Sequence, residues 1–165
     1  MVVRYNTRAN PDSRAFVELD GCRLKRMCVA LGASLNGFIL GCRNMLFVDG
    51  SHLSGPYEGM LFGAIALDSD NYMFDVAYAI VSFENNGDWE RFLTNLRECL
   101  SGLPPVVMFD RNKALLCAVR KVFCVDCYTY CVRNIWENFL TATTKYGYRK
   151  ESREDLLKEM LNRIA

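Results

Sequence analysis

Histidine is almost absent from this 165-residue sequence, in which His52 is the only one. Long apolar runs are also missing, because the longest stretch without a polar side chain extends only from Met60 to Leu67. A membrane-spanning helix needs about 20 such residues. The N-terminal residues lack the basic-then-apolar order of a signal peptide, and no Asn-x-Ser/Thr acceptor site occurs. We therefore expect neither a membrane protein nor a secreted one.

Excess charge of either sign is lacking too, since 20 basic side chains stand against 19 acidic ones. Proteins that hold nucleic acid through its phosphates alone usually carry a clear basic excess, so any nucleic-acid site must be local. One segment interleaves basic and aromatic side chains: Lys145, Tyr146, Tyr148, Arg149, Lys150 and Arg153. Within it, Lys145, Arg149 and Lys150 are the candidate nucleic-acid contacts. The alternative interpretation of the segment is a solvated loop between two helices.

Cysteines are present at about 5% of the chain, below the density of a disulfide scaffold. We expect mostly buried thiols in a reducing compartment. Cys124, Cys127 and Cys131 have a spacing compatible with zinc, but a fourth ligand is missing because His52 is distant in the sequence. We therefore expect no zinc. The absence of a His-x-Glu motif excludes a zinc deaminase.

Apolar residues make up 51% of the chain, enough for one compact domain with a substantial core. Apolar side chains between residues 16 and 31 recur at roughly helical spacing, with Gly21 as an irregularity. We predict one or two helices there. The next elements are strands at 45–49, 59–67 and 72–83, then a helix at 88–100 with Asp88 as its N-cap.

The second half of the predicted core is a strand at 106–110, a helix at 115–123, a short strand within 125–130 and a helix from 132 to 140. A final helix is predicted over 156–164. This order predicts an α/β fold with flanking helices. Its mixed sheet would contain a three-strand antiparallel meander, joined through a helical crossover to parallel strands.

Two aspartates follow strands that can be neighbours in such a sheet. Asp49 ends the first strand of the meander, and Asp110 ends the strand after the crossover. Two converging carboxylates repel each other unless a cation lies between them, and Mg²⁺ or Mn²⁺ suits such oxygen ligands. This is the chemistry of metal-assisted phosphoryl transfer. The alternative is that Asp49 begins a turn with Gly50 and Asp110 caps the next helix.

Blocks of residues spread over nearly the whole chain carry a family resemblance. They include Phe38-x-x-Gly41-Cys42-Arg43, Val48-Asp49-Gly50-Ser51-His52-Leu53-x-Gly55-x-Tyr57-x-Gly59, Phe74-x-Val76-Ala77-Tyr78, Phe109-Asp110-Arg111-x-Lys113-x-Leu115 and Tyr130-Cys131-Val132-Arg133. In this order they resemble the core of plant Mutator-like element (MULE) transposases.

The resemblance implies a ribonuclease H-like fold and a DDE triad of acids that cuts transposon ends and joins them to target DNA. Asp49 matches the first acid and Asp110 the second, with Mg²⁺ or Mn²⁺ as the cofactor. It implies a nuclear protein that binds DNA and that can oligomerise through regions outside this chain. We therefore divide the chain into an N-terminal helical segment (1–44), the transposase core (45–140) and the start of a C-terminal helical insertion (141–165).

The sequence departs from the family pattern at the third acid. The family's glutamate lies beyond the insertion, and none of the late acids Glu137, Glu154, Asp155 and Glu159 matches its position. The family's Cys-x-x-His pair appears here as Cys131-Val132-Arg133-Asn134. We therefore expect a transposase domain by origin that is incomplete and inactive in this chain. The alternatives are a non-catalytic DNA- or protein-binding module, or a stand-alone nuclease that uses Glu154 or Glu159.

Two further residues are candidates besides the two aspartates. His52 could touch a phosphate, but we interpret it as a turn histidine held by local hydrogen bonds. Glu84 resembles a recurrent acid of the family, and we interpret it as fixing the corner between a strand and the helix that contains Trp89. Neither residue is assigned to the catalytic set.

Overall fold

The structure is a computed structural model that describes residues 2–4, 10–55, 58–100, 102, 104–123, 127–147, 152, 155, 156 and 159. The chain forms two compact units, Met1–Thr129 and Tyr130–Ala165. The first unit contains the sheet strands up to β7, helices α1–α3 and most of the short strand β8, and the second contains helix α4.

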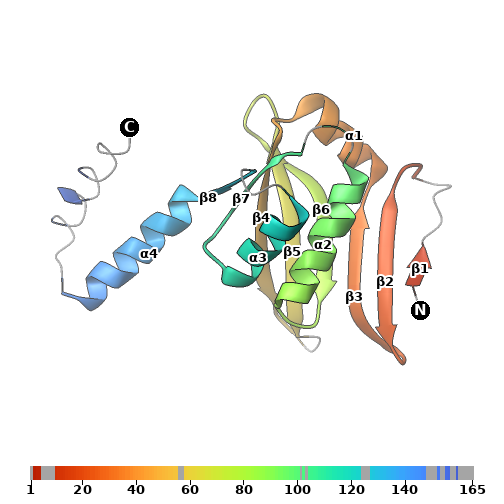
Figure 1. Cartoon of the computed structure of the whole chain (residues 1–165), viewed down its shortest axis with the longest axis horizontal. Coiled ribbons are helices and arrows are strands. Elements are labelled where there is room, and N and C mark those ends of the chain that lie inside the picture. Colours follow the sequence, from red (N-terminus) through yellow and green to blue (C-terminus); the bar gives the residue numbers. More distant parts are fainter. Residues whose placement is uncertain are drawn as a thin grey trace. The chain divides into compact units, whose positions relative to one another are not determined.

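Eight strands of the described residues form one sheet in the order β1-β2-β3-β6-β5-β4-β7-β8 (Figure 1). The strands are β1 (Val2–Arg4), β2 (Arg14–Asp20), β3 (Arg23–Ala30), β4 (Met45–Leu53), β5 (Gly59–Leu67), β6 (Met73–Val81), β7 (Val106–Phe109) and β8 (Tyr128–Tyr130). The helices are α1 (Gly32–Gly41), α2 (Asn86–Cys99), α3 (Lys113–Val122) and α4 (Val132–Lys145).

The pairing of the central strands confirms the predicted α/β fold. Strands β4, β5 and β6 form an antiparallel meander, and β7 joins β4 in parallel after the crossover through α2. This is the mixed sheet expected of a ribonuclease H-like fold. The order of β6, β5, β4, β7 and β8 places the strand after the crossover directly against the first strand of the meander.

The prediction of helices between residues 16 and 31 is wrong, because this segment forms the hairpin of β2 and β3. Gly21, with a φ of +59°, lies in the two-residue turn between the strands. A register shift between Glu18 and Leu19 interrupts the alternation that would have identified a strand. The apolar residues therefore follow one another at spacings that imitate a helix.

The first 44 residues are thus not a helical segment. The helix described before residue 45, α1, lies outside the range in which helices were predicted, and β3 pairs antiparallel with β6. The hairpin thereby extends the same sheet that contains the acid pair. The predicted boundaries at residues 45 and 141 stay a prediction.

The core lies between the sheet and helices α2 and α3, which cover one of its faces (Figure 1). The indole of Trp89 stacks on the ring of Phe62 at a centroid distance of 3.6 Å, and neither side chain is exposed. The largest fully buried side chains are Trp89, Phe62, Phe92, Phe109, Leu46, Leu93, Leu96, Leu115, Val48, Val76, Val107 and Val119. Burial on this scale supplies most of the stabilisation of the sheet–helix layer.

Helix α2 begins at Asn86, two residues before the predicted start at residue 88, so Asp88 is not its N-cap. Asn85 occupies that position, and its Oδ1 accepts a hydrogen bond of 2.9 Å from the Asp88 backbone N–H. The Asn85 amide in turn donates to the Asp88 carboxylate. The Asn85 oxygen thus caps the helix, and the Asp88 carboxylate holds the Asn85 side chain in this position.

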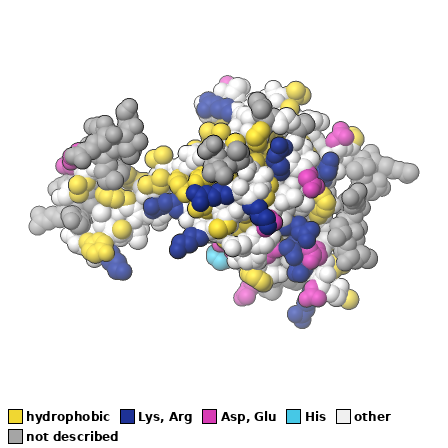
Figure 2. Space-filling view, viewed as in Figure 1, with side chains coloured by type: hydrophobic (Ala, Val, Ile, Leu, Met, Phe, Trp, Pro, Cys, Tyr) yellow, Lys and Arg dark blue, Asp and Glu magenta, His cyan; other side chains and the backbone are white. Residues whose placement is uncertain are grey.

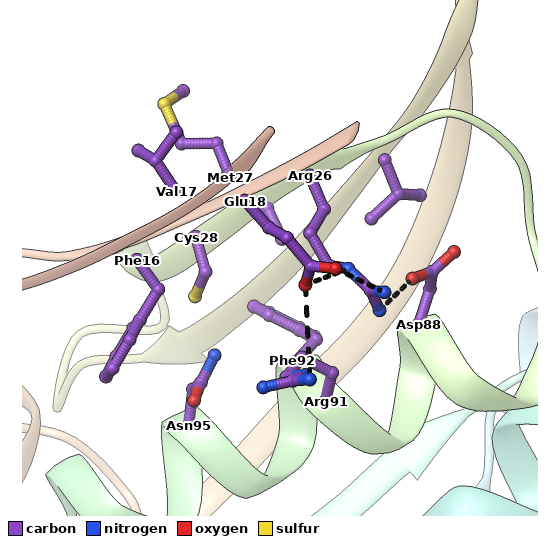
Figure 3. Close-up of a pocket in the computed structure, with 12 residues that line it drawn as sticks. Phe16, Val17, Glu18, Arg26, Met27, Cys28, Asp88, Arg91, Phe92 and Asn95 are labelled. Carbon is purple, nitrogen blue, oxygen red and sulfur yellow. Dashed lines mark hydrogen bonds and ion pairs between the residues drawn. The ribbon is translucent and has the colours of Figure 1, made fainter. Parts of the chain in front are cut away.

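The Asp88 carboxylate also joins α2 to the hairpin (Figure 3). Arg26 of β3 donates to Asp88 Oδ1 at 2.6 Å, and the Arg26 Nε atom lies 2.9 Å from Glu18 Oε2 of β2. These groups line a cavity of about 40 Å³ between β2, β3 and α2. The partly buried ion pairs fix α2 relative to the added strands.

The burial of the cysteine thiols differs from the prediction. Among the seven cysteines that the structure describes, all are free but only Cys28 is buried, so the prediction of mostly buried thiols is wrong. Burial raises the pKa of Cys28 to about 12, which keeps it a neutral thiol. Cys22 and Cys117 are exposed, and Cys124 lies outside the described residues.

The short strand and the helix predicted after residue 125 correspond to β8 and α4. Most of the helix predicted over 156–164 lies outside the described residues. Within the part of the chain that the structure describes, no helix is long and apolar enough to cross a bilayer.

Candidate active site

Asp49 lies within β4, four residues before the strand ends at Leu53. The alternative that it begins a turn is therefore wrong, and so is the predicted end of this strand at residue 49. Its Oδ1 accepts a hydrogen bond of 2.8 Å from the backbone N–H of Gly50. Gly50 lies close to the Trp89 and Phe62 rings, since an added Cβ would be 3.1 Å from the indole. The backbone beside Asp49 is thus packed against the core.

Asp110 follows β7 directly, and the strand register brings it beside Asp49. Phe47 of β4 pairs with Met108 of β7 in a parallel ladder. Two residues further along each strand are Asp49 and Asp110. Because parallel neighbours advance together, the register places Asp110 beside Asp49. The charge of Asp110 also raises the pKa of Asp49, which agrees with this placement.

The helix after Asp110 is capped by Asn112 rather than by Asp110. Asn112 Oδ1 accepts hydrogen bonds from the backbone N–H groups of Ala114 (2.8 Å) and Leu115 (3.1 Å). Asp110 Oδ1 instead accepts a hydrogen bond of 2.9 Å from the Asn112 backbone N–H. Sequence reasoning overlooked Asn112, although an asparagine directly before an apolar helical pattern is a recognisable N-cap signal.

Negative charge accumulates at this edge. The pKa of Asp49 is raised above its ordinary value, first because protein atoms remove part of its hydration and also because Asp110 and Glu84 repel its charge. The hydrogen bond from Gly50 opposes this shift. A site that disfavours its own ionised form in this way favours a bound cation.

Glu84 is the third carboxylate of this environment. It follows β6, whose end lies at the same edge as those of β4 and β7 because the three strands run in the same direction. Its Oε1 accepts hydrogen bonds from Trp89 Nε1 and from Asn112 Nδ2, each at 2.8 Å. The hydrogen bond from Trp89 agrees with the predicted role of Glu84 at the corner between the strand and the helix. The contact with Asn112 was not foreseen.

Replacement of Asp49 by Asn should stabilise the metal-free protein at neutral pH. A raised carboxyl pKa means that the folded state holds this proton more tightly than the unfolded chain, so stability falls as pH rises through that pKa. Asn removes the ionisation and keeps an acceptor for Gly50. We expect a higher melting temperature than that of the unmodified chain at pH 7, and no difference near pH 3. Equal melting temperatures at pH 7 would contradict this reasoning.

A hollow of about 500 Å³ adjoins Asp49 on the sheet. It is lined mainly by apolar side chains of β4, β5 and β6, including Phe47, Leu61, Ile65 and Tyr78.

The remaining predicted residues are placed as follows. His52 is exposed within β4, opposite Met60, so the interpretation as a turn histidine is wrong. Lys145 ends α4, whereas Arg149 and Lys150 lie outside the described residues. Glu137 binds Arg133 along α4 at 2.9 Å.

Of the other late acids, Glu154 lies outside the described residues, and Asp155 and Glu159 are exposed. Among the residues that the structure describes, no three metal-ligating side chains gather closely enough to hold an ion.

Basic and acidic side chains are mixed on the face seen in Figure 2. Lys121 on α3 and Glu90 on α2 form an ion pair with a distance of 2.6 Å. The mixture agrees with the nearly neutral composition, in which any contact with nucleic acid must be local.

Comparison with known proteins gives one family. The family model described as the MULE transposase domain matches residues 45–138, which include β4 to β7, both aspartates and Glu84. No curated protein matches the chain.

Proposed function

The chain belongs to the MULE transposase domain family, and from this premise we propose that Asp49 and Asp110 bind a divalent metal ion at the site of DNA processing. The observation that carries the proposal is the parallel register of β4 and β7, which aligns the two carboxylates. Membership of the family implies divalent metal and DNA as ligands. We propose in addition that Asp49 and Asp110 are the residues that bind the metal.

The donor set fits such an ion. Asp49 and Asp110 offer carboxylate oxygens, which Mg²⁺ and Mn²⁺ prefer, and their mutual repulsion is relieved by a cation. When bound, such an ion stabilises charge on the attacking and leaving oxygens of a phosphodiester. Gly50 and Asn112 orient the two carboxylates through backbone N–H groups.

We further propose that the natural substrates are transposon ends and target DNA, and that the protein acts in the nucleus of a plant cell. By origin the domain carries out DNA cleavage and strand transfer. The basic-aromatic segment from Lys145 through Arg149 and Lys150 is a candidate for local DNA contact. Its basic side chains can bind phosphates, and its aromatic side chains can stack on bases.

This chain by itself is proposed to be incomplete as a catalyst. Glu84, whose charge also acts on Asp49, is engaged by Trp89 and Asn112. The second candidate function is a non-catalytic DNA- or protein-binding module. It is favoured by the lack of a three-ligand cluster within the described residues.

Incubation of the purified chain with supercoiled DNA and Mg²⁺ or Mn²⁺ tests the proposed inactivity. We expect the DNA to remain uncut even at metal concentrations that saturate the protein. Nicking that requires metal and disappears in Asp49→Asn would contradict the inactivity and support a complete catalyst. DNA binding that Asp49→Asn leaves unchanged, without any metal binding, would support the binding module instead.

A further inference from the structure

Glu84 links two loops that leave neighbouring regions of the sheet edge. It follows β6, and its Oε1 atom receives hydrogen bonds from the indole of Trp89 and from the amide of Asn112, both at 2.8 Å. Trp89 belongs to α2, and Asn112 precedes α3. One carboxylate oxygen therefore connects the β6–α2 corner to the β7–α3 corner.

Trp89, the donor to Glu84 from α2, is held rigidly in the core. Trp89 is fully buried and stacks on Phe62 with an interplanar angle of 7°. Its indole N–H therefore has a fixed direction, and Glu84 is its acceptor. Because a buried indole N–H without an acceptor is costly, this contact holds Glu84 in place.

Asn112 extends this chain of hydrogen bonds to Asp110. The Asn112 side chain uses its oxygen to cap α3 and its amide nitrogen to reach Glu84, while its backbone N–H donates to Asp110 Oδ1 at 2.9 Å. Because the nitrogen and the oxygen of the Asn112 side chain are both hydrogen-bonded, the backbone of Asn112 is held in position as well. The connection from the core to the metal-binding carboxylate thus runs through Trp89, Glu84, Asn112 and Asp110.

We propose that Glu84 is a positioning residue for the metal site, which sets the orientation of Asp110 through Asn112. This inference rests on the proposed function, because it assumes that Asp110 binds metal. The alternative is that Glu84 is itself a ligand. The geometry favours positioning, because its Oε1 is committed to two donors and no three-ligand cluster is found among the described residues.

Glutamine distinguishes the two roles. Glu84→Gln keeps a carbonyl oxygen that can accept from Trp89 and Asn112 but removes the negative charge. Glu84→Ala removes both the acceptor and the charge. A positioning residue tolerates Gln and not Ala, whereas a metal ligand is damaged by both.

The experiment measures the affinity of the full chain for Mn²⁺ by calorimetry, with melting temperature recorded for each variant. We expect Glu84→Ala to weaken binding by roughly 10-fold, the lower end of the effect of losing an outer-shell partner. Glu84→Gln should stay within about 2-fold of the unmodified chain. Glu98→Ala, which removes a carboxylate near the other end of α2, is the matched control and should not change the affinity.

Asn112→Ser adds a second, independent test. Serine can still cap α3 but lacks the amide nitrogen that reaches Glu84. We expect the loss of Mn²⁺ affinity in Asn112→Ser to resemble that in Glu84→Ala. The double variant should lose little more than either single one, because both changes break the same connection.

Hydrogen exchange in the metal-free protein separates this inference from the proposed function. The chain contains two tryptophans, so the indole signal of Trp89 is readily assigned by NMR. Glu84→Ala should accelerate exchange of the Trp89 indole and of the Asn112 backbone amide, and Glu84→Gln should restore slow exchange.

The outcomes are distinguishable. Failure of the unmodified chain to bind Mn²⁺ overturns the proposed function, and exchange of the Asn112 amide then still decides whether Glu84 holds the Asp110 loop. Equal loss of Mn²⁺ affinity in Glu84→Gln and Glu84→Ala overturns the positioning role in favour of a ligand. Unchanged affinity and exchange in Glu84→Ala overturn both roles.

Discussion

Asp49→Asn and Asp110→Asn should each weaken the binding of Mn²⁺ to the chain by roughly 10-fold or more, since loss of even an outer-shell partner has an effect of 10-fold to 100-fold. Each change replaces a charged carboxylate with a neutral amide of nearly the same shape. The two residues come from neighbouring parallel strands in register, so each contributes one side of the same site. A calorimetric titration of the unmodified chain and the two variants measures the effect.

The matched control is Asp70→Asn, which makes the same chemical change in the exposed turn between β5 and β6. Its Mn²⁺ affinity should equal that of the unmodified chain. If Asp49→Asn and Asp110→Asn also bind Mn²⁺ with unchanged affinity, the acid pair is not the metal site. A loss confined to one variant would mean that the two carboxylates do not share an ion.

Trp89→Ala should lower the free energy of unfolding by about 3–5 kcal/mol, the usual cost of truncating a buried aromatic residue. Trp89 is fully buried, stacks on Phe62 and lies beside Phe92. Its removal leaves a cavity between α2 and the sheet and also releases the hydrogen bond to Glu84. Urea denaturation followed by far-UV circular dichroism measures the loss.

Trp89→Phe separates packing from hydrogen bonding in this position. The phenyl ring keeps most of the contact with Phe62 but has no N–H for Glu84. We expect a smaller loss of stability than in Trp89→Ala, together with a reduced Mn²⁺ affinity if Glu84 positions Asp110. A loss of less than 1 kcal/mol in Trp89→Ala would contradict the role of this indole as the centre of the core.

The predicted changes in metal affinity and in stability both depend on the packing of α2 against the sheet. Helix α2 provides the buried face that holds the sheet and also the indole that holds Glu84. Changes in the core under α2 therefore reach the acid pair through the Glu84–Asn112 contact. Metal affinity should follow the packing of α2 even where a substitution lies far from Asp49 and Asp110.

The central part of the fold could be predicted because its local signals are strong. The apolar runs of β4, β5 and β7 are short and are bounded by turn residues, and the apolar residues of α2 recur at clear helical spacing. Their order along the chain limits the topology to a meander followed by a parallel strand. The two aspartates could be identified because each follows apolar residues of a neighbouring strand.

The hairpin of β2 and β3 could not be predicted in the same way. Its strands owe their conformation to pairing with each other and with β6, and the register shift at Glu18 hides the alternation of faces. Strand formation depends on non-local partners far more than helix formation does. The local pattern therefore indicated a helix where the sheet imposes a strand.

The sequence by itself determined the type and order of the central elements and indicated Asp49 and Asp110 as the candidate acids, because these depend on local apolar patterns and on residue chemistry. Only the tertiary structure decided that β4 continues past Asp49 and that Glu84 contacts both Trp89 and Asn112. These contacts join residues up to 28 positions apart. They arise from strand register and helix packing, which fix distances that no local pattern contains.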